Sequence, residues 1–127
     1  MLRKIIITAA TLALVSATSA FAQGIKRTPL QKVDFPPGFE TVTAIAEIPP
    51  GGAAGKHSHP GAETGYVMEG ELELLVEGKP PLKLKAGESY QIPAGIAHDA
   101  KASGDKPMKV LAIYIVTKGE PLAKPAP

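Results

Sequence analysis

Two of the chain's three histidines stand two residues apart, with a glutamate close behind, in the segment GKHSHPGAETGY. In an extended chain, residues i and i+2 point to the same side, about 6.6 Å apart. His57 and His59 therefore face one way, and Glu63 follows at an even interval. Two imidazoles and a carboxylate suit Fe, Mn, Ni, Zn or Cu. Alone, an H-x-H pair is more often a polar surface feature, and the bend at Pro60-Gly61 leaves the register of Glu63 open.

Glycines and a proline frame these residues at fixed spacing. The first pattern is Gly51, five residues, His57, one residue, His59, three residues, Glu63, six residues and Gly70. The second pattern is Gly87, five residues, Pro93, one residue, Gly95, two residues and His98, the third histidine. Together they resemble the paired motifs of the cupin superfamily, G-x5-H-x-H-x3,4-E-x6-G and G-x5-P-x-G-x2-H-x3-N. The chain departs from them only at Ala102, where the family has Asn.

The resemblance covers Gly51 to Ala102 and implies a fold as well as a site. The implied fold is all-β with little or no helix, a double-stranded β-helix of the jelly-roll or cupin-barrel kind. The implied site is a divalent transition metal, Fe or Mn by family and Zn, Ni or Cu as further possibilities, held by His57, His59, Glu63 and His98. Three neutral imidazoles and one carboxylate leave such a site with about one positive charge. It would therefore favour an anionic oxygen ligand.

The strands that must position these residues are visible as short apolar runs between turn residues. The runs are ETVTAIAEI (40–48), YVM (66–68), ELELLVE (71–77), LKLK (82–85), ESYQI (88–92), AHDAKA (97–102) and MKVLAIYIV (108–116). Glu69-Gly70 is expected to form a hairpin turn between two of them. Many short strands in a small domain predict a β-sandwich or barrel, in agreement with the resemblance.

The first 22 residues have the organisation of a signal peptide. Arg3 and Lys4 precede an apolar stretch, and Ala20-Phe21-Ala22 forms a cleavage site before Gln23. We therefore expect a periplasmic or secreted protein without a membrane anchor after cleavage near Ala22/Gln23. The remaining chain divides into an N-terminal lead-in (23–39), expected to be loose, the cupin β-barrel (40–117) and a Pro-rich tail (118–127), expected to be disordered.

Charge and composition limit the partners of the mature chain. Removing Arg3 and Lys4 from the 14 basic residues leaves 12, equal to the 12 acidic residues. A neutral domain of mixed charge gives no electrostatic reason to expect nucleic acid as a partner. The chain has no cysteine and so no disulfides. The long apolar run near the C-terminus favours a homodimer.

Few polar residues are available to assist a metal. If the strands alternate regularly, the positions that share a face with Glu63 and His98 are small or apolar. They are Gly65, Val67, Ala100 and Ala102. The remaining polar candidates for the pocket are Tyr90, Gln91 and Tyr114, each of which could equally be packed or on the surface.

A metal pocket without a protein base suits chemistry that the metal and O2 carry themselves, behind walls that exclude water. The leading hypothesis is therefore an oxygenase similar to quercetinase-like small cupins, acting on a small anionic or enolisable substrate. Two alternatives stay open. One is a non-catalytic periplasmic module that binds a metal or small ligand. The other is a lyase, isomerase or decarboxylase that uses the metal as a Lewis acid and needs a base such as Tyr90 or Tyr114.

Overall fold

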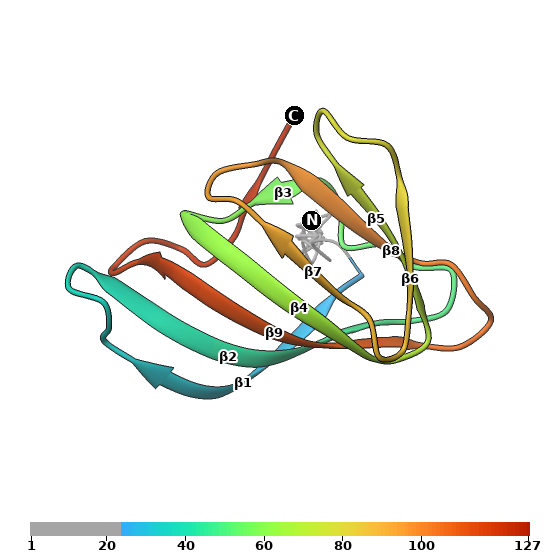
Figure 1. Ribbon diagram of the computed structural model, residues 1–127, viewed down its shortest axis with the longest axis horizontal. Helices are drawn as coiled ribbons and strands as arrows, with labels where there is room; N and C mark the ends of the chain where they lie inside the picture. The colour runs from blue at the N-terminus through green and yellow to red at the C-terminus, as the bar shows by residue number, and fades with distance from the viewer. Residues whose placement is uncertain (1–23) are drawn as a thin grey trace, which may run out of the picture.

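The computed structural model describes residues 24–127, which form two five-stranded antiparallel sheets (Figure 1). The strands are β1 (Lys26–Val33), β2 (Phe39–Ile48), β3 (His57–Ser58), β4 (Gly61–Glu69), β5 (Glu71–Val76), β6 (Leu82–Lys85), β7 (Ser89–Ile92), β8 (His98–Ala102), β9 (Met108–Thr117) and β10 (Lys124–Pro125). One sheet has the order β1-β2-β9-β4-β7 and the other β10-β3-β8-β5-β6. The described part of the chain contains no helix, hence none that could cross a membrane. The predicted all-β class is confirmed.

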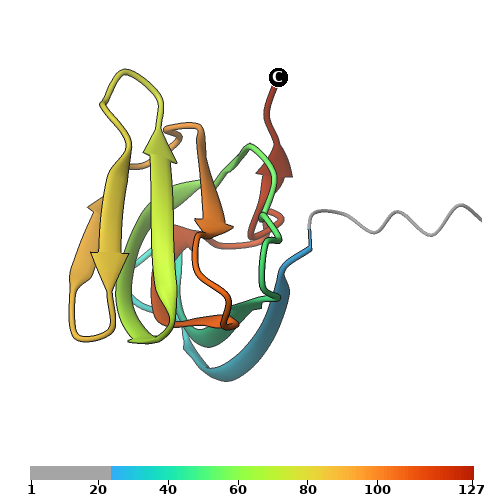
Figure 2. The same ribbon diagram turned by 90° about the vertical axis from the view of Figure 1, so that its right-hand side faces the viewer.

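The core lies between the two sheets, where alternate residues of each strand point inward. In β2 the buried positions alternate with half-buried ones from Val42 to Ile48, and in β9 they alternate from Met108 to Val116. These two strands pair along their whole length in the centre of the first sheet. Period-two burial is what a sheet with one covered face requires. Figure 2 shows the resulting two layers in a second view.

The turn predicted at Glu69-Gly70 is a corner between sheets and not a hairpin. β4 pairs with β9 and β7, whereas β5 pairs with β8 and β6 in the other sheet. Gly70 has φ +76°, and a Cβ there would collide with the backbone carbonyl of Pro107. Glycine is needed because the left-handed conformation and the close contact both exclude a side chain. The motif glycine thus lets the chain cross between the layers.

Both ends of the described chain are more ordered than the sequence predicted. Lys26–Val33, expected to be loose, forms β1 and pairs with β2. The tail, expected to be disordered, forms β10 beside β3 and places Leu122 against the core. Both strands lie at sheet edges and contain proline, which an edge strand tolerates because one side of its backbone is unpaired. Mostly exposed strands carry no alternating pattern, and so the expectation for both segments was wrong.

The predicted signal peptide, residues 1–22, lies outside the described residues. Export therefore stays a prediction. The described chain begins at Gly24, and the segment from there leads into β1 (Figure 1). Ile25 packs against the core there.

Candidate metal centre

The four residues of the predicted ligand set lie together between the sheets. His57 comes from β3, His98 from the neighbouring strand β8 directly opposite it, and Glu63 from β4 in the other sheet. His59 follows β3. One ligand atom from each residue lies within 4.8 Å of the others, and all four side chains are buried. Residues 41 positions apart in sequence are thus brought to one point by the pairing of β3 with β8.

Backbone carbonyls determine the tautomer of every imidazole. The Nδ1 atoms of His57, His59 and His98 lie 2.6, 2.7 and 2.9 Å from the carbonyl oxygens of Gly55, Leu122 and Ile96, respectively. A carbonyl oxygen only accepts, so each Nδ1 carries the proton and donates it. In a neutral ring Nε2 then carries a lone pair, as a metal ligand must.

With neutral rings, the Nε2 atoms of two histidines and an oxygen atom of Glu63 are hydrogen-bond acceptors that face one another. Oε2 of Glu63 lies 2.9 Å from Nε2 of His59 and 3.2 Å from Nε2 of His98. Although these atoms are close and buried, both imidazole nitrogens lack a hydrogen-bond partner. Buried polar atoms are almost always satisfied. A cation among these lone pairs would replace repulsion by coordination, so the residues present fit a divalent metal ion.

The charge states also fit metal binding, which needs deprotonated ligands. Burial lowers the pKa of His57 to about 4, against the opposing effect of the Gly55 carbonyl, so the ring is neutral at neutral pH. Burial alone would raise the pKa of Glu63, but the hydrogen bonds and positive charge that His59 and His98 provide when protonated outweigh burial and hold that pKa below its usual range. Three neutral nitrogens and one carboxylate oxygen are a borderline donor set that suits first-row divalent ions.

Tyr90 supports the carboxylate of the cluster. Its hydroxyl donates to Oε1 of Glu63 over 2.8 Å, which leaves Oε2 directed at the imidazoles. Burial and the charge of Glu63 raise the pKa of Tyr90 well above its usual value, so it keeps this proton. The ring lies over Gly65, its cross-strand neighbour, where any Cβ would overlap it. Gly65 therefore provides the space through which Tyr90 reaches the site.

The other two pocket candidates from the sequence, Tyr114 and Gln91, lie in different surroundings. Tyr114 is 1% exposed, and its ring centroid lies 4.8 Å from that of His59. Burial, followed by the charge of Glu63, raises its pKa to about 12. Gln91 is exposed on β7, since its neighbours Tyr90 and Ile92 take the inward positions. Gln91 is therefore not a pocket residue, and its prediction was wrong.

Sequence reasoning missed Arg27. This residue of β1 is half-buried opposite Ala46, an inward position of β2. Its Nη2 donates to Nε2 of His57 over 3.3 Å, and its Nε donates to the Tyr114 hydroxyl over 3.4 Å. The register of β1 on β2 would have identified it, but the sequence did not predict that β1 is a strand.

Three residues of the cluster, His57, Glu63 and His98, enclose a small cavity together with Arg27, Tyr90 and Tyr114. Its volume for a water-sized sphere is about 20 Å³, about enough for one water molecule or one ion. Five apolar side chains complete its wall, from Ile25, Ala46, Leu74, Ala100 and Met108.

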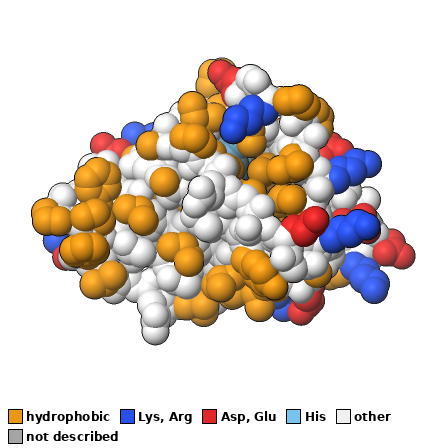
Figure 3. Space-filling model, in the orientation of Figure 1, with side chains coloured by type: hydrophobic (Ala, Val, Ile, Leu, Met, Phe, Trp, Pro, Cys, Tyr) orange, Lys and Arg blue, Asp and Glu red, His pale blue; other side chains and the backbone are white. Residues whose placement is uncertain are grey.

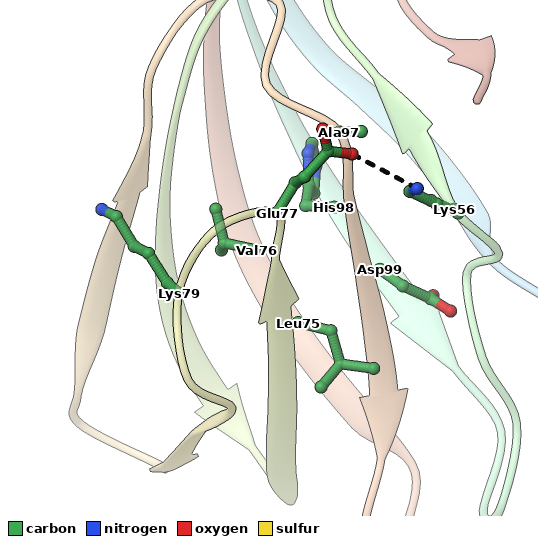
Figure 4. A pocket seen from close by; sticks show the side chains of 8 residues that line it. All are labelled: Lys56, Leu75, Val76, Glu77, Lys79, Ala97, His98 and Asp99. Atoms are coloured by element: carbon green, nitrogen blue, oxygen red, sulfur yellow. Dashed lines mark ion pairs between the residues drawn. The ribbon is translucent and has the colours of Figure 1, made fainter. Parts of the chain in front are cut away.

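A larger open pocket of about 250 Å³ borders the cluster at His98. Figure 4 shows it, with the ion pair between Lys56 and Glu77 beside that histidine. On one face of the molecule, a histidine side chain is visible at the bottom of a hollow (Figure 3). The cluster therefore lies close to the surface although its side chains are buried.

The hydrogen bond from Tyr90 predicts a measurable effect on metal affinity. We expect Tyr90→Phe to weaken Co2+ binding about 10- to 100-fold, because partners that orient a ligand typically contribute that much. Competition with a chromophoric chelator measures the affinity. Gln91→Ala, a change at the exposed neighbour, should leave it unchanged. Equal affinities for Tyr90→Phe and the original protein would show that this bond does not orient Glu63.

Known proteins of similar sequence are longer than this chain. A germin-like protein (subfamily 2 member 2) of Arabidopsis thaliana is 37% identical over 86 residues, which cover 61% of this chain and 39% of that protein. Dimethylsulfoniopropionate lyase DddQ of Ruegeria pomeroyi is 36% identical over 58 residues, covering 46% of this chain and 28% of the lyase. The chain thus spans well under half the length of these two relatives.

Solved structures support the fold. The crystal structure of the same lyase superposes with a TM-score of 0.70 at 24% identity, covering 85% of this chain and 54% of the lyase. A double-stranded β-helix protein of Klebsiella pneumoniae superposes with a TM-score of 0.65 at 24% identity, covering 79% of this chain and 84% of that one. The family model named "Cupin domain" matches residues 44–114, more than half of the chain. The protein therefore belongs to the cupin family.

Proposed function

We propose that this protein is a metal-dependent enzyme that acts on a small anionic or enolisable substrate. The observation that carries the proposal is the set of three buried imidazoles, each with Nδ1 bonded to a backbone carbonyl, converging with a carboxylate oxygen. On a six-coordinate divalent ion, four protein ligands would leave positions for a further ligand, and an open position is what distinguishes catalytic from closed sites. The ion would supply Lewis acidity toward an oxygen atom of the substrate.

Among the reaction classes, we favour a lyase, isomerase or decarboxylase. The oxygenase hypothesis rested on a pocket without a protein acid or base, but Tyr114 lines the cavity. Its raised pKa keeps it protonated at neutral pH. Because Arg27 donates to its oxygen, the hydroxyl proton stays available to a bound molecule. The proton of Tyr90 is instead committed to Glu63.

Tyr114 would therefore act as the proton donor to the reacting substrate, while Tyr90 would hold the carboxylate of the cluster. Proton transfer by a positioned side chain commonly accounts for about 10²- to 10⁴-fold in rate. The similarity to a protein named as a lyase agrees with this class. That likeness supports the proposal without naming a substrate.

An oxygenase is the second candidate. The apolar side chains in the cavity wall, such as Leu74 and Met108, would exclude water from a reaction with O2. The two candidates make opposite predictions about oxygen. Turnover by the first needs none, whereas turnover by the second stops without it.

The proposal is tested by measuring turnover with and without O2. The protein is loaded with Mn2+, Fe2+ or Zn2+ and offered a panel of small carboxylic and enolisable acids. We expect activity in both atmospheres and a loss of about a hundredfold or more in kcat for Tyr114→Phe, because the substitution removes the proton donor. Lys83→Gln, a change at an exposed residue of β6, is the control. Activity only with O2 would replace the lyase by the oxygenase. Metal binding without any turnover would favour a non-catalytic binding module.

We also propose a homodimer formed through the outer face of the first sheet. Tyr66, Ile113 and Ile115 are 37 to 48% exposed on this face. The cross-strand rows through Ile113 and Ile115 carry threonine, alanine, glutamine and valine, with no charge. Flat uncharged faces of this kind favour association with a like surface. The apolar run 108–116 lies in the centre of the first sheet. It would therefore contribute side chains of the outer sheet face to the dimer interface, and not a free strand edge.

Light scattering after gel filtration measures the state of association. We expect twice the monomer mass for the original protein and a monomer for Ile113→Glu, because a charge would be buried at the interface. A monomeric original protein would refute the dimer. Thermal unfolding of Ile113→Glu checks that the variant stays folded.

A further inference from the structure

The guanidinium of Arg27 is a charge without a counter-charge. Its two hydrogen-bond partners are the imidazole of His57 and the hydroxyl of Tyr114, and neither is a carboxylate. Within residues 24–127 it forms no ion pair. A half-buried cation that lines a cavity and lacks an anion is costly unless a ligand supplies one.

Occupation of the cluster by a metal would change the position of Arg27. The lone pair on Nε2 of His57, which now accepts from Nη2 of Arg27, would be used in coordination. The Arg27 donor would then need another acceptor. A divalent ion with the Glu63 carboxylate would leave one positive charge, and the guanidinium would add a second. The loaded site therefore requires anionic oxygen atoms next to both cations.

We propose that Arg27 is the residue that binds the carboxylate of the substrate, and that the substrate carries a second oxygen donor for the metal. This inference rests on the metal-dependent function proposed above. The guanidinium has parallel N–H groups that match a carboxylate in a two-point contact. The substrate class is a small dicarboxylate or a carboxylate with a neighbouring oxo or hydroxyl group.

The size and position of the cavity agree with this class. Only about 20 Å³ is open to a water-sized sphere while Arg27 contacts His57, so a ligand enters by taking the place of that contact. Tyr114, also bonded to Arg27, would face the same ligand from the other side. Arg27 thus connects the anion to the proton donor. It lies on the edge strand β1, whose only sheet neighbour is β2.

Binding of two probes to the Co2+-loaded protein tests the proposal. Malonate offers two carboxylates and acetate one, and the visible absorption of Co2+ reports each dissociation constant. We expect Arg27→Gln to bind malonate roughly 10- to 100-fold more weakly, the usual range for hydrogen bonds to a charged group. Its preference for malonate over acetate should shrink accordingly. Arg27→Lys should retain part of the affinity, since the charge stays and the two-point contact is lost.

Metal affinity separates this role from a merely structural one. Arg27→Gln should bind Co2+ at least as tightly as the original protein, because the competing donor to His57 and a repelling charge are both removed. A general loss of packing would weaken Co2+ and malonate binding together. Lys26→Gln removes the same charge from the exposed neighbour and should change neither constant.

Three results would overturn the inference. Co2+ binding with equal malonate affinity in the original protein and in Arg27→Gln would remove the role of Arg27 and leave the metal site intact. Weaker binding of both Co2+ and malonate in Arg27→Gln would assign it a structural role. No Co2+ binding at all would remove the proposed function and this inference with it. Thermal unfolding of each variant shows whether it is folded. If Arg27→Gln is not folded, Arg27→Lys is compared with the original protein in its place.

Discussion

The structure of the site depends on three hydrogen bonds from imidazole Nδ1 atoms to backbone carbonyls. They determine which nitrogen of each ring carries the proton, and so direct the Nε2 lone pairs of His59 and His98 at the carboxylate of Glu63 and that of His57 at Arg27. Without a cation, these buried hydrogen-bond acceptors face one another without a donor between them, which is unfavourable. The protein maintains it because the carbonyls belong to the folded backbone. Stability and metal binding are thus coupled in one small volume.

The fold supplies this arrangement from segments that are far apart in the chain. The paired strands β3 and β8 bring His57 opposite His98, and the facing sheet contributes Glu63. The edges then complete the site. The segment before β10 provides the carbonyl of Leu122, and β1 provides Arg27. The barrel therefore holds the ligands, while the two ends of the described chain set the tautomer of one ligand and the charge beside another.

The sequence was informative where patterns are local. The two glycine- and proline-framed motifs, through their resemblance to the cupin superfamily, predicted the cluster, and strand alternation predicted which neighbours of Glu63 and His98 face inward. Which strands pair with one another could not be predicted from local sequence patterns. Glu69-Gly70 marks a break whether the chain makes a hairpin or crosses to the other sheet, so the corner could not be distinguished from sequence. Arg27 and Leu122 were missed for a related reason, since exposed edge segments show no periodicity.

Long-range 1H–15N spectra of the imidazoles in metal-free, 15N-labelled protein near neutral pH test the central claim most directly. The chain has three histidines, so three rings are observed. We predict a protonated Nδ1 and an unprotonated Nε2 in every ring, with all three Nε2 signals shifted by one equivalent of Zn2+ and no further change on adding more. A proton on Nε2 of any ring, or a ring that does not respond to Zn2+, would contradict the account.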